Sequence, residues 1–331
     1  MKQKNIYILL FAVSTLVYIS CSNNEKDFFD SPEQVQAQVS LEDSTCVSEP
    51  FQELANKIDE LNEQYEEECL KARGWRDFWS RVKQWTCVVL SDAIGFGIGY
   101  GGASTFGANP IVGAVGGVAV GASFSYAIYN YAVKGNADIQ VFARRTSPEQ
   151  SAGSPFKDGS ISLNFDVLAP DSIGDEIDSV GYMHNMVLRS LYSDSTMHYQ
   201  PDSIPKYITR AMVRTEILDC YSMHVQNYIE YKMDNIEYVD SIISDSISFH
   251  DYCTEMANLF PTEREFILVL ERVCVGLERL DIIGKRKSYI GDIMNYVDNS
   301  SLTTNQKKKV KGCIQTAYAS SLLWEEEQMT E

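Results

Sequence analysis

The 41 residues from Ala93 to Val133 contain no charged side chain, although Asp, Glu, Lys and Arg make up 22% of the chain. Ten of the 20 glycines of the chain lie inside this stretch, between Gly95 and Gly121. A run of this length without charge belongs where water is excluded, in a protein core or in lipid. No other part of the sequence limits the possible folds as strongly.

Small residues recur every four positions on both sides of Asn109-Pro110, a turn signal that divides the stretch into arms at 93–108 and 111–133. A spacing of four places these residues on one helix face, where two helix backbones can approach closely. The alternation in GFGIGYG also fits a strand, but the repeat in the second arm favours a helix. We therefore predict a helical hairpin and assign helix packing to Gly97, Gly101, Gly113, Gly117 and Gly121.

This composition and spacing resemble the glycine-zipper hairpins of bacteriocin-like peptides and pore-forming toxins, and the resemblance implies a hairpin that can enter a membrane. As helices, the second arm would reach about 34 Å and the first about 24 Å, against roughly 30 Å of hydrocarbon. Extending the first arm back to Trp85 brings Asp92 into the apolar layer, at a cost of about 2.5 to 3.5 kcal/mol. We therefore expect a hairpin shielded by neighbouring helices, with membrane insertion as a conditional second state.

Three of the four tryptophans lie in WRDFWSRVKQW, residues 75–85, which we call the Trp/Arg helix. Residues 71–85 carry a net charge of +4 in a chain that is otherwise acidic. Aromatic rings beside Lys and Arg are typical of the interface between membrane and water. The same residues also suit a helix packed on its neighbour. Both interpretations stay open for the membrane-proximal or helix-packing residues Trp75, Trp79 and Trp85.

An amphipathic helix is predicted before the Trp/Arg helix, and Gly74 ends it. Its apolar residues fall in steps of three and four, at Phe51, Leu54, Ile58, Leu61 and Tyr65. Because this stripe covers barely two heptads, packing within its own domain is favoured over a coiled coil with a partner. Residues 50–134 are thus expected to hold the amphipathic helix, the Trp/Arg helix and the glycine-zipper hairpin.

The N-terminus has the pattern of a secretory signal peptide: Lys2 and Lys4, the apolar run IYILLFAVSTLVYI, and then Ser20-Cys21. A small residue before a cysteine resembles the cleavage site of bacterial lipoproteins of the signal peptidase II type. The resemblance implies removal of residues 1–20 and attachment of lipid, such as palmitate, to Cys21. The following SNNEKDFFD is similar to acidic signals that send some lipoproteins to the cell surface. We expect a lipid-anchored protein of the bacterial outer membrane.

Residues 21–49 carry the lipid anchor and then a polar, acidic segment that is typical of a flexible tether. Removal of residues 1–20 leaves 26 basic and 46 acidic residues, a net charge of −20. This charge opposes binding to nucleic acid. The expected partners are membrane lipid, through acylated Cys21, and a protein partner of the C-terminal helices.

Seven cysteines remain beside Cys21, and they follow no CxxC or zinc-site spacing. An exported protein can form disulfides, but several of these cysteines fall on apolar faces of predicted helices, which favours buried thiols. The seven are Cys46, Cys69, Cys87, Cys220, Cys253, Cys274 and Cys313. We expect no metal and no cofactor.

Residues 135–175 read as a linker in which ADIQVFA and SISLNFDVL are candidate short strands. The pattern is helical from 176 to 331. Helix starts are indicated at Ser203 with Pro205, at Pro261, and at Thr303 with Gln306 as a capping box; Gly284 is expected to end a helix. The predicted fold class is mostly α, with the glycine hairpin, a short mixed connection and a C-terminal all-α domain.

Histidines offer the only hints of catalysis. His184 and Asn185 are interpreted as a buried, hydrogen-bonded structural pair rather than a catalytic one, and Cys220 with His224 as a chance spacing. We therefore expect a non-enzymatic lipoprotein with a binding or structural role. The alternatives are a membrane-active protein of bacteriocin or pore-forming type and, more weakly, a hydrolase with an unrecognised site.

Overall fold

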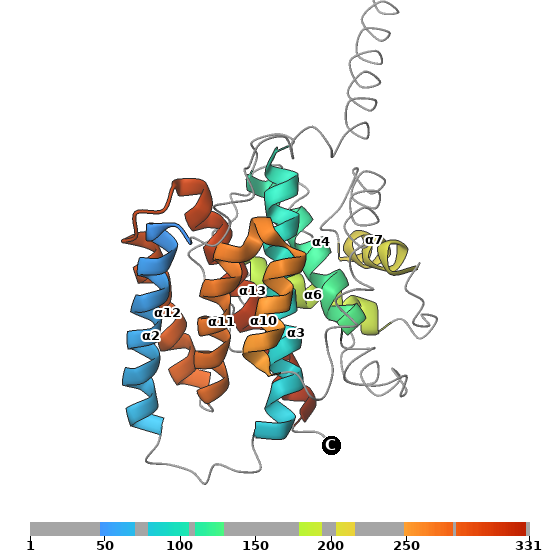
Figure 1. Cartoon of the computed structure of the whole chain (residues 1–331). Coiled ribbons are helices and arrows are strands. Elements are labelled where there is room, and N and C mark those ends of the chain that lie inside the picture. The colour runs from blue at the N-terminus through green and yellow to red at the C-terminus, as the bar shows by residue number, and fades with distance from the viewer. Residues whose placement is uncertain are drawn as a thin grey trace, which may run out of the picture. The chain divides into compact units, whose positions relative to one another are not determined.

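The computed structural model describes residues 47–69, 79–105, 110–128, 179–193, 203–215, 248–280 and 283–328. All of them belong to the unit Val47–Glu331, one of the two units into which the chain divides. Within these ranges the protein is almost entirely helical and contains no strand (Figure 1). The prediction of a mostly α fold is confirmed.

The described residues form nine α-helices and one 3-10 turn. Their bounds are α2 (Glu49–Cys69), α3 (Trp79–Thr105), α4 (Pro110–Ile128), α6 (Val180–Tyr192), α7 (Ile204–Arg214), α10 (Phe249–Leu259), the 3-10 turn η4 (Pro261–Glu263), α11 (Arg264–Arg279), α12 (Ile283–Asp298) and α13 (Thr304–Gln328).

The hairpin of α3 and α4 lies at the centre of this unit, and other helices cover it. α13, α11 and α10 pack on α3, while α6 and α7 pack on α4. α2 packs on α11 and α12, so the first described helix lies beside helices from the end of the chain (Figure 1). One continuous apolar core joins all of these elements. The hairpin is therefore the middle of a helical body and not an appendage to it.

Local signals account for several helix starts. Thr303 and Gln306 form the predicted capping box: the Gln306 backbone N–H donates to Thr303 Oγ1 at 3.3 Å, and the Thr303 N–H donates to Gln306 Oε1 at 2.9 Å. A second box, which the sequence analysis did not identify, starts α10 with Ser248 and Asp251. Pro205 lies in the first turn of α7, as expected from its fixed backbone angle.

Two predicted boundaries are wrong. Gly284 does not end a helix: α11 ends at Arg279, and Gly284 lies in the first turn of α12. The break falls earlier because Leu280 is buried in an extended conformation and its carbonyl accepts a hydrogen bond from Arg286. Residues 79–105, which include most of the Trp/Arg helix and most of the first hairpin arm, are also one continuous helix, α3, since residues 86–94 are buried and contain no helix breaker.

Several predicted features lie outside the described residues. They are the signal peptide (1–20), the tether up to residue 46, Cys21, Trp75, both candidate strands and the rest of 135–175, Cys220 and His224. Among the residues that are described, no helix has both the length and the apolar character needed to cross a membrane.

Candidate functional site

The backbones of α3 and α4 touch at glycines. A Cβ added to Gly95 would lie 2.9 Å from Gly121 Cα, and one added to Gly99 would overlap the Gly116 carbonyl. Real Cβ atoms do not come this close to backbone atoms, so a larger residue requires the two helices to separate. Gly95 and Gly99 were not among the assigned packing residues, although their own spacing of four was the available signal.

The glycines of α4 face successive turns of α3. A Cβ on Gly113 would lie 2.9 Å from the Tyr100 ring, and one on Gly117 would lie 2.5 Å from the Phe96 ring. Gly121 lies against the backbone carbonyl of Asp92, at 2.9 Å from the same hypothetical atom. These three predicted positions therefore line the helix–helix contact as one row.

Gly97 and Gly101 lie on the face of α3 that is turned towards α13 and not towards α4. A Cβ on Gly97 would lie 3.2 Å from Cys313 Sγ, and one on Gly101 would lie 3.2 Å from Lys309 Nζ. Both partners are on α13, so the two predicted glycines pack against a different helix from the three on α4. Trp79 and Trp85 are within α3, so they belong to the same helix as Gly97 and Gly101.

An ion pair occupies the space beside Gly97 and Gly101. Lys309 Nζ donates to Glu263 Oε2 at 2.5 Å and lies 4.0 Å from the centre of the Phe266 ring. Both charged residues are buried. Removing one partner would leave an uncompensated charge in the core, which is strongly destabilising.

A second buried polar cluster joins four helices around Asp92. Ser125 of α4 donates to Asp92 Oδ2 at 3.1 Å, and Ser320 of α13 donates to the same oxygen. His184 of α6 approaches with Nε2 3.7 Å from Asp92 Oδ2. The side chains of Asp92 and His184 are both 0% exposed. Burial of an acid and a base side by side costs free energy unless both groups are uncharged or form a well hydrogen-bonded ion pair.

Asn185 orients the histidine of this cluster. Asn185 Nδ2 donates to the Ala319 carbonyl at 2.8 Å, so Asn185 Oδ1 is an acceptor. His184 Nδ1 lies 3.2 Å from that oxygen and therefore donates its proton to it. This contact is the hydrogen-bonded His–Asn pair predicted from the sequence. It leaves Nε2 without a proton in the neutral ring, facing Asp92.

Burial decides the protonation of both groups. It raises the pKa of the Asp92 carboxyl well above its ordinary value, against the opposing hydrogen bonds from Ser320, Ser125 and Trp324. It lowers the pKa of His184 to about 4, against the opposing contacts with Asn185 and the Gly121 backbone. Although 3.7 Å is within ion-pair distance, both shifts favour the uncharged forms.

The cluster contains Ser, His and Asp, but their arrangement is not that of a nucleophilic triad. A triad needs a serine hydroxyl hydrogen-bonded to the histidine, with the carboxylate behind the ring. Here both Ser125 and Ser320 donate to the carboxyl oxygen instead. The chemistry that this arrangement supports is the holding of a proton inside the core.

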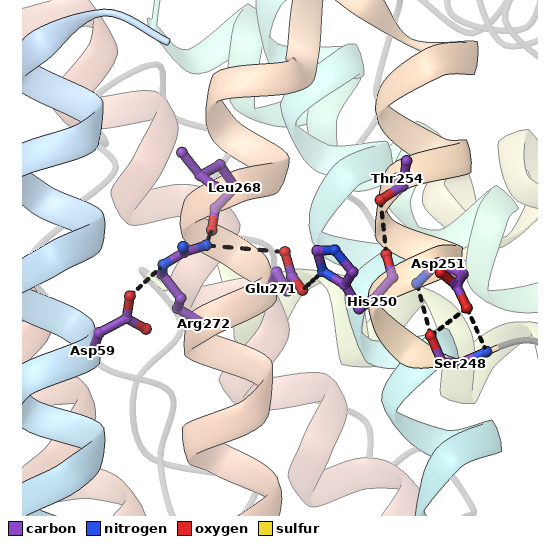
Figure 2. A network of polar contacts seen from close by, with 8 residues as sticks. All are labelled: Asp59, Ser248, His250, Asp251, Thr254, Leu268, Glu271 and Arg272. Atoms are coloured by element: carbon purple, nitrogen blue, oxygen red, sulfur yellow. Dashed lines mark hydrogen bonds and ion pairs between the residues drawn. The ribbon is translucent and has the colours of Figure 1, made fainter.

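A third polar network runs along the surface from α2 across α11 to α10 (Figure 2). His250 Nδ1 lies 2.7 Å from Glu271 Oε1, and Arg272 Nε donates to Asp59 Oδ2 at 2.8 Å. Hydrogen bonding to Glu271 raises the pKa of His250. The His250 side chain is 75% exposed, so solvent screens this contact and it contributes little to stability.

Four cysteines lie in the described helices with buried side chains and no disulfide: Cys87, Cys253, Cys274 and Cys313. For these four the prediction of buried thiols is confirmed. Burial raises the pKa of the Cys313 thiol to about 12, which makes it a poor nucleophile. Within the described part of the chain, no group of three or more His, Cys, Asp or Glu side chains could hold a metal ion.

Comparison with known protein families, curated proteins and solved structures gives no match for this chain.

Proposed function

We propose that this protein is a membrane-anchored lipoprotein of the cell surface or periplasm with a non-enzymatic binding or structural role, in which the glycine hairpin is the packing core of a helical body. The observation that carries this proposal is the covering of the hairpin. α6 and α7 pack on α4, and α10, α11 and α13 pack on α3.

The contacts of the glycines support packing within the protein rather than in lipid. Gly95 and Gly99 bring the α3 backbone onto α4, while Gly97 and Gly101 accommodate α13. Contacts on two faces of one helix need a surrounding bundle. The buried carboxyl of Asp92 adds a polar group that has hydrogen-bond donors in this bundle and would lose them on leaving it.

The anchor in this proposal is the acyl group on Cys21, and the C-terminal helices bind the protein partner. A net charge of −20 for residues 21–331 makes nucleic acid a poor partner. The protein thus holds an acidic helical body near a membrane without inserting it.

The experiment that tests the anchor compares two cysteine variants in bacterial membranes. With Cys21→Ser we expect loss of the lipid adduct, seen by mass spectrometry of the N-terminus, and failure to fractionate with the outer membrane. Cys46→Ser is the matched control and should keep both. An unlipidated wild-type protein, or a Cys21→Ser variant that still carries lipid, would contradict the proposal.

A second candidate function is that of a membrane-active protein whose hairpin leaves its shield. The feature that favours it is the complete burial of Asp92, which raises the pKa of its carboxyl well above the ordinary value, because a neutral carboxyl costs less to place in lipid than a carboxylate. Asp92 directly precedes the uncharged stretch, and residues 93–133 themselves carry no charge.

Dye release separates the two candidates. The lipidated protein is reconstituted into dye-loaded vesicles of phosphatidylethanolamine and phosphatidylglycerol at pH 5 and at pH 8. A packing hairpin should leave the vesicles sealed at both pH values. Release that is stronger at pH 5, where Asp92 is more protonated, would support the membrane-active function and reject the packing proposal.

A further inference from the structure

We infer that Asp92 and His184 hold one shared proton in the core, carried on the Asp92 carboxyl and donated to His184 Nε2, and that this proton joins the glycine hairpin to α6. The inference does not depend on the proposed function, because it concerns how the body holds together and not where the body is anchored.

Gly121 creates the space for this contact. A Cβ at this position would lie 2.9 Å from the Asp92 carbonyl and 3.5 Å from His184 Cδ2. The glycine therefore lets the imidazole ring reach α3 past the backbone of α4. Gly121, which the sequence pattern predicts only as a helix-packing residue, therefore also shapes the polar cluster.

The hydrogen-bond directions leave one place for the proton. Ser125 and Ser320 both donate to Asp92 Oδ2, which makes that oxygen the acceptor side of the carboxyl. Asp92 Oδ1 and His184 Nε2 are both buried and make no hydrogen bond of good geometry, although the Trp324 indole approaches the carboxyl and the Gly121 backbone approaches the histidine. His184 Nε2 lies 3.7 Å from the carboxyl, at Oδ2, and a proton carried on the carboxyl is the donor that this bare nitrogen lacks.

Among the described residues, the groups that interact with the pair are uncharged. They are the hydroxyls of Ser125 on α4 and Ser320 on α13, the indole of Trp324 on α13, the amide of Asn185 on α6, the hydroxyl of Tyr252 on α10 and the thiol of Cys274 on α11. Burial raises the pKa of both Tyr252 and Cys274, so neither supplies a charge. Withdrawing the proton would therefore leave a carboxylate with only dipoles to stabilise it.

The sign of the pH dependence follows from linkage. A folded-state pKa above the ordinary value of a carboxyl means that Asp92 stabilises the fold fully at low pH and that this contribution is lost as the pH rises through the raised pKa. His184 has its effect at low pH. Its pKa in the folded protein is about 4, below the ordinary 6.5, so the stability contributed by the neutral histidine is lost as the pH falls from about 6.5 towards about 4. The pair keeps its single proton between these limits.

The test is urea unfolding of the purified full-length protein at pH 5 and pH 8, with Asp92→Asn and the half-exposed Asp59→Asn as matched variants. One extra bound proton in the folded state changes the unfolding equilibrium constant about tenfold per pH unit. From pH 5 to pH 8 we expect the unfolding constant of the wild type to increase at least about tenfold more than that of Asp92→Asn, with Asp59→Asn following the wild type. Equal pH dependence in wild type and Asp92→Asn would overturn the inference.

A measurement on the wild type keeps the inference testable if Asp92→Asn does not fold. Infrared spectra of protein labelled with ¹³C in its aspartate carboxyls should show a protonated carboxyl band at pH 7, because only a carboxyl with a strongly raised pKa retains a proton there. Absence of that band in the folded protein would show an ionised Asp92 and overturn the inference.

Discussion

At the scale of single residues, Phe96 brings three helices together. Its ring lies against Gly117 of α4, and a Cβ on Gly312 of α13 would overlap it from another helix. Phe96 also stacks on Tyr100, with ring centres 5.9 Å apart. The glycines on α4 and α13 therefore form a slot for one large aromatic side chain. Their weak helix propensity is offset by the burial of this ring and by dispersion contacts around it.

The glycine contacts predict a large difference between two identical substitutions. Gly99→Ala adds a methyl group where the Gly116 backbone already lies, whereas Gly291→Ala on α12 meets nothing within 4 Å. We expect Gly99→Ala to reduce the free energy of unfolding by about 1 to 3 kcal/mol. Gly291→Ala should raise it by up to about 1 kcal/mol, since alanine favours a helix.

Urea unfolding monitored by circular dichroism measures both changes. If Gly99→Ala were as stable as Gly291→Ala, the close approach of α3 and α4 would be wrong. Both substitutions gain the helix propensity of alanine, but only Gly99→Ala also overpacks the contact between α3 and α4. The difference in stability between the two variants therefore isolates that contact.

At the scale of helices, α2 is held to α11 and α12 by a buried hydrogen-bond chain. Tyr289 Oη donates to Asn62 Oδ1 at 2.7 Å, and Asn62 Nδ2 donates to the Arg272 carbonyl at 3.0 Å. Gly276 makes this possible, because any side chain there would overlap the Tyr289 hydroxyl. Three helices are thereby joined through one amide that has partners on both of its polar atoms.

Removal of one hydroxyl tests this connection. Tyr289→Phe leaves Asn62 Oδ1 buried without its donor, and we expect a loss of about 1 to 3 kcal/mol in the free energy of unfolding. Tyr65→Phe is the matched control, since Tyr65 Oη donates to Asp292 at 3.1 Å in a partly buried place. A loss no larger than that of the control, measured by urea unfolding, would argue against the buried chain.

At the scale of the whole molecule, charge and apolar character are separated into layers. Among the described residues, most charged side chains are at least partly exposed, while the hairpin, α6 and the middle of α13 are buried. The buried exceptions, such as Asp92, Lys309 and Glu263, lie where helices from distant parts of the chain meet. The ionisable groups of the core therefore mark its junctions, and their protonation affects how the helices hold together.

The sequence by itself determined that the described residues are mostly helical, that a second helix of the uncharged stretch begins at Pro110, and that Thr303 with Gln306 starts a helix. These features depend on periodicity and on capping residues a few positions apart, so each can be recognised locally. The hydrogen-bonded pair of His184 and Asn185 was predictable for the same reason. The errors at Gly284 and at the start of the first arm concern boundaries, where burial of distant side chains overrides local signals.

Only the tertiary structure decided what each face of the hairpin meets. A spacing of four places Gly97 and Gly113 on helix faces but does not say that the first faces α13 and the second faces α3. In the same way, Asp92 and His184 are separated by the whole uncharged stretch and the connection after it, and nothing local indicates that they meet. Helix formation is a local property of the chain, whereas the pairing of faces is a property of the assembled core, because only there do excluded water and close packing act on both partners at once.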